Sequence, residues 1–433
     1  MSGTLAAILG FVVMFVLMLV RVPVGVAMGL VGIAGFALLV DIGPALRLLV
    51  QAPVRFASDE VLSVVPMFIL MGTLATMSGL GRELFSASNA MAGHRRGGQA
   101  VATIWASAGF AAICGSAVAS AATMARVTLP EMKRYGYDRA FACATIAVGG
   151  TLGILIPPSV VMALYGAIVE QDVARLFMAG VLPGIVAVFF HLLVIRYVVW
   201  RTPGKAPPGP RSSWPERWAA LGQIWAVLAL FLLVMGGMYG GAFTPSEGAA
   251  MGAGGALIIG VLRKRLNGKS TAQALVQAAR TTGSIFVIVF GAVVFGQFLA
   301  ITQAPQDLTN WVGGLSLSRY EVLAIILVIY FILGAIMDEI AMILLTVPIV
   351  YPIILKLGFD PIWFGVIIVM TVELGLIVPP VAMNLFVLHN IAGDVPLTDI
   401  FKAIIPFIVA DILRLIVLCA FPEISTWLPS TMG

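Results

Sequence analysis

Two pairs of adjacent prolines, Pro157–Pro158 and Pro379–Pro380, stand in matching surroundings in the two halves of the chain. Asp138 precedes the first pair by 19 residues, and Asp360 precedes the second pair by the same number. Proline lacks an N–H group and disfavours helical geometry in the residue before it, so nearby carbonyl oxygens lose their helical partners. Each break lies in a long apolar segment, where such a break is tolerated only if it is buried in protein or lines a cavity. A matched pair of breaks therefore predicts the binding site of a secondary transporter.

A run of small residues precedes the first break and supplies hydroxyl groups. Residues 115–123 read Gly-Ser-Ala-Val-Ala-Ser-Ala-Ala-Thr. Small residues let backbones approach closely, and their carbonyl and hydroxyl oxygens are ligands for a hard cation. Together with the freed carbonyls near 150–156 they favour Na⁺, although ordinary tight helix packing also explains the run. We take Thr123 and Ser159 as candidates for substrate or gate contacts.

The second half adds acidic and amide side chains at similar depth. Acids inside a membrane are costly and usually functional. Asp338 is interpreted as a functional acid, with capping of a helix in a hairpin as the alternative, whereas Glu339 can simply face an aqueous mouth. Glu373 and Asn384 are further substrate or gate candidates, and a structural role for Glu373 stays open.

The remaining polar groups do not indicate a further functional site. Asp411 and Arg414 lie three residues apart on an expected helix, which favours mutual neutralisation. Asn267-Gly268-Lys269-Ser270 resembles the end of a phosphate-binding loop, but Arg263 occupies the position that needs glycine, so we expect no ATP or other nucleotide. The three histidines are not clustered, and the three cysteines all lie in apolar stretches, which indicates neither a metal site nor a disulfide framework.

The composition indicates the class of protein to which these groups belong. Of 433 residues, 61% are hydrophobic and 10% are charged, which excludes an ordinary soluble domain. Apolar windows long enough to cross a bilayer recur from end to end. The chain is therefore predicted to be an all-α polytopic membrane protein. Its net charge of +5 does not indicate nucleic-acid binding, because the basic residues lie between the apolar segments.

The apolar segments divide into two halves of similar order. We expect a first repeat over 1–200, a cytoplasmic linker over 201–218 that holds five prolines, and a second repeat over 219–433. Each repeat is expected to contain spans, one re-entrant hairpin and one broken helix. The expected spans are 4–20, 24–42, 60–81 and 175–200, then 219–239, 246–262, 282–301 and 400–421. The hairpins are 98–130 and 320–354, closed by Pro130 and Pro348, and the broken helices are 140–170 and 361–392.

The basic residues predict the orientation. If each hairpin enters and leaves the membrane on the same side, the basic residues fall mainly on one side of the membrane; otherwise this asymmetry is lost. Both termini are therefore expected to be periplasmic and the repeats to be inverted. Residues 4–20 have no preceding positive charge and are followed by Arg21, which favours a retained span over a signal peptide. Segments 44–57 and 269–281 are too polar to span, and are interpreted as amphipathic helices at the two interfaces, with plain loops as the alternative.

Several motifs resemble the large membrane subunit of tripartite ATP-independent periplasmic (TRAP) transporters. They are Ile113–Ser116, Pro130–Met132 with Tyr135–Tyr137, Gly150–Ser159, Phe177–Gly184, Asp360–Gly365, and Glu373 to Val381. Their order and spacing match the family over nearly the whole chain. The resemblance implies an elevator-type, ion-transporter-superfamily fold and Na⁺-coupled uptake of an organic acid through the bacterial inner membrane. It also implies two partners, a small four-helix membrane subunit and a periplasmic substrate-binding protein.

The resemblance also implies two sodium sites, each between a hairpin and its broken helix. The first comprises Ser116, Ser120, Gly150, Gly153 and Pro157, and the second comprises Gly334, Asp338, Gly375, Val378 and Pro379. The sequence departs from the family pattern at Val378, where threonine is common, and at Ala382, where glycine is common. A threonine hydroxyl ligand is therefore lost from the second site. A stand-alone carrier of the same superfamily is the alternative function, and an intramembrane enzyme is a distant one, because no catalytic constellation is present.

Overall fold

The computed structural model describes residues 3–57 and 60–432, and all the regular secondary structure of these residues is helical. Seven helices in this part of the chain are long and apolar enough to cross a membrane, or eight if the bent pair α4–α5 counts as one span. The prediction of an all-α polytopic protein is confirmed.

Helices of the first half begin and end as follows: α1 (Gly3–Leu19), α2 (Val24–Leu39), α3 (Ile42–Ala57), α4 (Glu60–Met77), α5 (Leu80–Ala92), α6 (Gly98–Cys114), α7 (Ala117–Arg134), α8 (Arg139–Leu155), α9 (Val160–Val169) and α10 (Val173–Arg201). A short 3₁₀ turn, η1 (Pro203–Lys205), and α11 (Trp214–Gln223) lie in the expected linker.

Helices of the second half follow in a similar order: α12 (Trp225–Phe231), the π-helical turn η2 (Leu232–Gly236), α13 (Gly237–Tyr239), α14 (Pro245–Leu262), α15 (Gly268–Thr302), α16 (Ala304–Gly313), α17 (Arg319–Gly334), α18 (Glu339–Lys356), α19 (Pro361–Gly375), α20 (Met383–Ala392), α21 (Leu397–Ala420) and α22 (Glu423–Ser430). Helices α7 and α18 begin 222 residues apart, as do α8 and α19. The two halves therefore share one order of elements, whereas their inverted orientation stays a prediction.

Both expected hairpins are pairs of helices joined by a tight turn. In the first, Gly115 adopts a left-handed conformation with φ +68°, which glycine accepts without strain, and Ser116 caps α7. In the second, Asp338 caps α18. The hairpins are longer than expected, because α7 continues past Pro130 to Arg134 and α18 continues past Pro348 to Lys356. A proline inside a helix removes one hydrogen bond but need not end the helix.

Both expected helix breaks are confirmed at the proline pairs. Helix α8 ends at Leu155 and α9 starts at Val160, while α19 ends at Gly375 and α20 starts at Met383. Both Pro–Pro peptide bonds are cis. The breaks fall within the expected ranges. In the second break, residues 376–378 lie outside regular helix before the proline pair. In the first break only Ile156 does, because residues 150–155 still belong to α8, so the expected loss of helical partners near 150–156 is limited to the end of that range.

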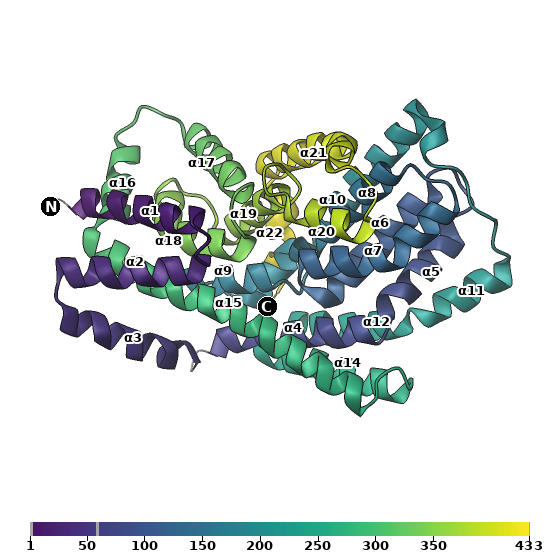
Figure 1. Cartoon of the computed structure of the whole chain (residues 1–433), viewed down its shortest axis with the longest axis horizontal. Helices are drawn as coiled ribbons and strands as arrows, with labels where there is room; N and C mark the ends of the chain where they lie inside the picture. Colours follow the sequence, from purple (N-terminus) through teal and green to yellow (C-terminus); the bar gives the residue numbers. More distant parts are fainter. Residues whose placement is uncertain (1–2, 58–59, 433) are drawn as a thin grey trace.

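The molecule has two layers along its long axis. Figure 1 shows one layer that runs along a long side of the molecule and includes α2, α3, α4, α12, α14 and α15. The other layer holds the hairpins and broken helices, together with α10 and α21 (Figure 1). The layers meet where α4 packs on α6 and α9, and where α15 packs on α18.

Three expectations about the layer that includes α3, α4 and α15 are corrected by the structure. The plain-loop alternative is wrong for both amphipathic segments: 42–57 forms α3, and 269–281 is helical. The second segment is not a separate helix, however, because it continues without a break into the span and forms the 35-residue α15. The expected span 60–81 ends early, since the chain turns by 62° between α4 and α5 at Gly79, which has φ +77°.

The proline-rich linker is tied to the rest of the protein by backbone hydrogen bonds. Gly97 N–H donates to the Ala206 carbonyl at 3.0 Å, and Asp138 N–H donates to the Lys205 carbonyl at 2.9 Å. Gly209 N–H donates to Gly93 at 2.9 Å. The linker is therefore held against the loop before α6 and the loop between α7 and α8.

Candidate functional site

The first hairpin packs directly on the first broken helix at two glycines. A Cβ atom placed on Gly150 would lie 2.5 Å from the Ala121 Cβ atom. A Cβ atom placed on Gly153 would lie 2.6 Å from the Ser116 carbonyl oxygen and 2.8 Å from the Ser120 hydroxyl oxygen. Only glycine permits this approach, which brings the start of α7 against the end of α8. The structure thus brings together four of the five predicted residues of the first cation site.

Ser120 provides an oxygen atom without a conventional partner at this contact. The side chain is fully buried, and its hydroxyl oxygen has no hydrogen-bond partner among the described residues. The neighbouring Cys114 thiol interacts with it, but a thiol is a weak hydrogen-bonding group. A buried hydroxyl left in this state is unfavourable, so its oxygen is suited to a cation held with the Ser116 carbonyl. The residues at this contact fit Na⁺, which takes oxygen ligands.

The second hairpin repeats this arrangement on its own broken helix. A Cβ atom on Gly375 would lie 2.4 Å from the Gly334 carbonyl carbon. The Ala335 carbonyl accepts a hydrogen bond of 3.1 Å from Val381 N–H, just as the Gly115 carbonyl accepts one of 3.4 Å from Val160 N–H. Each hairpin tip is therefore joined to the start of the segment that follows its proline pair.

Asp338 caps a helix in this structure. One carboxylate oxygen, Oδ1, accepts hydrogen bonds from Ile340 N–H at 3.0 Å and Ala341 N–H at 3.4 Å. This is the alternative role that the sequence left open, and it uses one of the two oxygens. The predicted cation contact of Asp338 stays a prediction. Among the described residues, no group of three His, Cys, Asp or Glu side chains is placed to hold a metal ion, so any cation here depends on backbone and hydroxyl oxygens as well.

Val378 and Ala382, the two residues of the second break that depart from the expected pattern, differ in what they offer to a ligand. Val378 offers only its backbone, and its N–H donates to the Gly375 carbonyl at 3.4 Å. Ala382 is buried and adopts a left-handed conformation with φ +40°. That conformation strains a residue with a Cβ atom, so glycine would fit this position with less strain. Pro379 is exposed, unlike Pro157, which is buried.

A cavity of about 410 Å³ lies between the two layers at the tips of both hairpins. Its walls come from α4, the α6–α7 turn, α9, α15 and the start of α18. Of the predicted residues, Ser116 and Thr123 line it. Ser159, Glu373 and Asn384 do not line it and are fully buried elsewhere. Ser159 instead caps α9, accepting from Met162 N–H at 3.2 Å and donating to the Ile154 carbonyl at 2.5 Å.

Arg126 is the cavity residue that sequence reasoning missed. It lies three residues after Thr123 on α7, so both side chains share one face of the helix, and both line the cavity. A single basic residue within an otherwise uncharged stretch of the hairpin was the available signal. Helices α4 and α15 add neutral polar groups from Thr73, Thr76 and Gln277. Glu339, which the sequence allows to face an aqueous mouth, also lines the cavity and is only 7% exposed.

Glu373 belongs to a buried ionic network rather than to the cavity. One of its oxygens accepts from Arg414 at 2.8 Å and the other from the Thr151 hydroxyl at 2.7 Å. Arg414 also lies 3.3 Å from Asp411, which is 3.0 Å from His191. The expected Asp411–Arg414 pairing is confirmed, but it is part of a larger set that joins α8, α10, α19 and α21. Thr151 and Glu373 are 222 residues apart, so equivalent positions of the two halves meet here.

Asn384 also has a structural contact. Its side-chain amide donates to the Ala147 carbonyl on α8 at 3.3 Å. It thus ties the second broken helix to the first. The predicted substrate or gate roles of Asn384, Glu373 and Ser159 stay predictions, while each side chain has a packing role in this structure.

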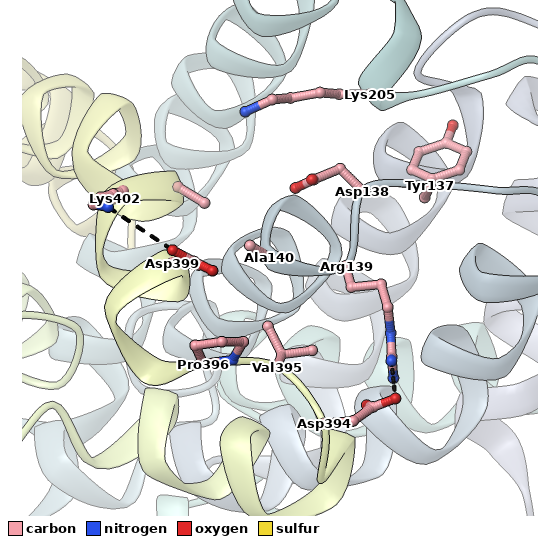
Figure 2. Close-up of a pocket in the computed structure, with 11 residues that line it drawn as sticks. Tyr137, Asp138, Arg139, Ala140, Lys205, Asp394, Val395, Pro396, Asp399 and Lys402 are labelled. Carbon is pink, nitrogen blue, oxygen red and sulfur yellow. Dashed lines mark hydrogen bonds and ion pairs between the residues drawn. The ribbon is translucent and has the colours of Figure 1, made fainter.

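A second cavity, of about 550 Å³, lies at the end of the hairpin layer beside the linker (Figure 2). Figure 2 shows Arg139 paired with Asp394, and Lys402 near Asp399 at 3.9 Å. The hydrogen bond from Arg139 holds the pKa of Asp394 below its usual value. Asp138 caps α8 by accepting from Phe141 N–H. Lys205 also lines the cavity and forms no ion pair among the described residues, whereas the other charges named here pair with one another or cap a helix. The cavity therefore lies at a junction between the linker and the two halves.

Comparison with known proteins places the chain among transporters. The sequence model of the family described as "Tripartite ATP-independent periplasmic transporter, DctM component" matches residues 11–424. The C4-dicarboxylate TRAP transporter large permease protein DctM of Pseudomonas aeruginosa is 37% identical over 86% of this chain and 87% of its own length. The isethionate TRAP transporter permease protein DctMQ of Oleidesulfovibrio alaskensis is 31% identical, with 97% of this chain but only 65% of that protein covered. The crystal structure of the Alcanivorax borkumensis YdaH transporter is similar in fold, with a TM-score of 0.64 over 90% of each chain at 15% identity.

Proposed function

Because this chain belongs to the DctM component family of TRAP transporters, as its motifs predicted, we propose that it carries an organic acid inward across the bacterial inner membrane together with Na⁺. The relatives named above are permeases for a C4-dicarboxylate and for isethionate, both small organic anions. Members of this family are multi-pass transporter components, and the activity proposed for this chain is transport rather than catalysis. Both termini are proposed to lie in the periplasm.

The observation that carries the proposal is the cavity between the two hairpin tips. It contains Arg126, the hydroxyl groups of Ser116 and Thr123, and walls from both layers. A guanidinium group binds a carboxylate with two parallel hydrogen bonds. Arg126 is therefore the proposed anchor for the acid group of the substrate, and the neighbouring hydroxyls complete its hydrogen bonds.

Sodium is proposed to bind where each hairpin meets its broken helix. Ser116 and Ser120 with the backbone near Gly150, Gly153 and Pro157 would hold one ion. Asp338 with the backbone near Gly334, Gly375, Val378 and Pro379 would hold the other. Ser116 belongs both to the first proposed ion site and to the cavity wall. An ion at this contact would therefore fix the hairpin tip that the substrate touches, which couples the two binding events.

The two layers suit an elevator mechanism. The hairpins and broken helices would move together as one body against the layer that includes α4 and α15. The ionic network of Glu373, Arg414, Asp411 and His191 lies within the proposed moving layer and joins elements of both halves. This network favours motion of the layer as a unit, because separating the helices that it joins would leave buried charges unpaired.

Two partners are proposed, a small four-helix membrane subunit and a periplasmic substrate-binding protein. The family description names a tripartite system, and this chain covers 65% of the DctMQ relative. Helix α3 offers a suitable apolar surface, since Leu46, Val50 and Val54 recur every four residues and are 53%, 70% and 64% exposed. Uptake by the isolated chain, unaffected by either partner, would instead indicate a stand-alone carrier.

The proposed function is tested by measuring the apparent affinity for the substrate after Arg126, the proposed anchor, has been replaced. The complex is reconstituted with both partners, and uptake is measured for wild type, Arg126→Met and Arg126→Lys. Loss of a charged hydrogen-bonded contact of about 1.5–3 kcal/mol should raise the half-saturating substrate concentration roughly 10- to 150-fold in Arg126→Met. Arg134→Met is the control, because Arg134 ends the same helix with a side chain that is 72% exposed. Equal uptake by the Arg126 and Arg134 variants would refute the assignment.

A further inference from the structure

Three cavities lie in a row along the hairpin helix α7. The cavity at the hairpin tips shares Arg126 with a smaller cavity of about 270 Å³, which we call the middle cavity. The middle cavity in turn shares Tyr137 and Arg139 with the cavity beside the linker, where Figure 2 shows both side chains. Its lining comes from α7, the loop after α7, the start of α8 and the end of α20. The middle cavity therefore lies between the proposed substrate cavity and the linker.

The charged side chains that line the middle cavity are all basic. They belong to Arg126, Lys133 and Arg139. Arg139 is paired with Asp394, whereas Arg126 and Lys133 form no ion pair among the described residues. Both of these residues are exposed, so their charges are accessible to a ligand. The lining therefore has an excess of positive charge that no described acidic side chain neutralises.

The two unpaired basic residues continue one face of α7. Residues that line the first two cavities follow along this helix at spacings of three and four: Thr123, Arg126, Pro130 and Lys133. Such spacings place side chains on one side of a helix. Seven residues separate Arg126 from Lys133, which is about 10 Å along the axis. A small anion in the middle cavity is therefore within reach of both long basic side chains.

The excess of positive charge ends at the cavity beside the linker. The basic residues that line this cavity are matched in number by acids: Arg139, Lys205 and Lys402 on one side, and Asp138, Asp394 and Asp399 on the other. A lining of one sign raises the local concentration of an oppositely charged ligand, whereas a balanced lining does not. An anion would therefore be attracted into the middle cavity and would lose this attraction in the next one.

We infer that the middle cavity is a second, transient binding site for the carboxylate substrate, where Lys133 receives the acid group that Arg126 releases. This inference rests on the proposed function and extends it to the release of substrate toward the linker, on the proposed cytoplasmic side. The volume suits a small organic anion, since it lies just below the range of about 300–1,000 Å³ that is typical of ligand pockets. A role of the basic residues in topology alone would instead make Lys133 and its neighbour Arg134 equivalent.

The charge of the middle cavity is measured with two thiol reagents of opposite sign. The purified complex of this chain with its small membrane subunit carries one cysteine in a cysteine-free background. Ile391→Cys places it in the middle cavity, and Thr398→Cys places it at an exposed position outside all three cavities. The reagents are methanethiosulfonates with a sulfonatoethyl or a trimethylammonioethyl group. We expect the ratio of the anionic to the cationic modification rate to be at least about fivefold higher at Ile391→Cys.

Variants of two neighbouring basic residues show which charge creates this preference. In the Ile391→Cys background, Lys133→Gln should lower the ratio at least about threefold, and Lys133→Arg should preserve it. Arg134→Gln is the control and should leave the ratio unchanged, because Arg134 does not line the middle cavity. Equal ratios at the two cysteines, or equal effects of Lys133→Gln and Arg134→Gln, would overturn the inference. So would a selective loss of the preference at Ile391→Cys in phosphatidylglycerol but not in phosphatidylcholine, because the cavity would then hold a lipid headgroup.

Binding kinetics test whether the site lies on the route of the substrate. The same complex without added cysteines is held in saturating Na⁺, and the tightest-binding acid among succinate, isethionate, gluconate and pyruvate is used. A site along the route changes the rates of association and dissociation together, without changing the equilibrium affinity. Lys133→Gln should therefore slow both rates at least about threefold and change the dissociation constant less than about twofold, while Lys133→Arg restores the rates.

The kinetic results also separate this inference from the proposed function. Unchanged rates in Lys133→Gln would overturn the inference, even if the reagent ratio falls. A weaker affinity at an unchanged association rate would assign Lys133 to the first binding site, which also overturns it. If none of the four acids binds to the wild-type complex, the proposed function fails for these acids and so does the release step, while the reagent ratios still decide whether the middle cavity attracts small organic anions.

Discussion

The variant Ser120→Ala should show whether Ser120 is a cation ligand or only a packing residue. The Ser120 hydroxyl is fully buried beside Gly153 and has no conventional hydrogen-bond partner among the described residues. If it has no ligand, removing it deletes an unsatisfied polar group. Without Na⁺, the variant should therefore be as stable as wild type or more stable by about 1 kcal/mol. If the hydroxyl binds Na⁺, the stabilisation that Na⁺ provides should decrease.

The size of this decrease follows from linkage between binding and unfolding. At a Na⁺ concentration of about 100 times the dissociation constant, one site stabilises the folded protein by about 2.7 kcal/mol. A tenfold weaker site at the same concentration contributes only about 1.4 kcal/mol. Ser120→Ala should thus lose about half of the stabilisation by Na⁺ at this site, while its stability in choline is maintained.

The assay is thermal unfolding of the purified complex over a series of Na⁺ concentrations, with choline as the replacement cation. Ser107→Ala is the matched control, since Ser107 is also fully buried on the same hairpin with an unpartnered hydroxyl, but it faces Gly149 rather than Gly153. It should show the same behaviour in choline and an unchanged response to Na⁺. If Ser120→Ala and Ser107→Ala respond equally to Na⁺, the first cation site is misplaced.

Three further outcomes are expected. Arg414→Met leaves Glu373 and Asp411 buried without their cation and should lower the stability of the fold by about 3–5 kcal/mol. This loss is measured by thermal unfolding, with the exposed Arg134→Met as the control. A loss below about 1 kcal/mol would show that the ionic network contributes little to stability. Ala382→Gly should relieve the left-handed strain and raise stability by up to about 1 kcal/mol, and a loss of stability would show that the strain is absent. Cysteines placed at Ser212 and Thr431 in a cysteine-free background should be labelled by an impermeant thiol reagent from the cytoplasmic and periplasmic sides, respectively, and the reverse pattern would exclude the proposed topology.

The sequence was sufficient to locate the breaks and hairpins because their causes are local. Two adjacent prolines in the interior of an apolar segment remove helical hydrogen bonds locally, and Asp338 precedes a helix that it can cap. Apolar length predicted most spans to within a few residues. The continuity of α15 was missed because its polar beginning suggested a separate interfacial helix, whereas no residue near 281 forces the chain to turn.

The composition of the cavity was harder to predict because its residues are distant in sequence. Arg126 and Glu339 lie on different hairpins, and only the packing of both hairpins against α4 and α15 brings them to one space. Similarly, Glu373 was identified as an acid inside the membrane, but its partners on α8 and α21 depend on how the two halves meet. Side-chain type indicated that these residues are unusual, and tertiary contacts decided which of them pair with other buried side chains and which line the cavity.

The central claim, Na⁺-coupled uptake of an organic acid, is tested most directly by ion replacement in proteoliposomes. The complete system of this chain, the small subunit and the binding protein is reconstituted, and uptake of a labelled substrate is measured with an inward Na⁺ gradient. We expect uptake to collapse when Na⁺ is replaced by K⁺ or choline, even if a proton gradient is imposed. Full uptake driven by the proton gradient alone, in the absence of Na⁺, would rule out Na⁺ coupling.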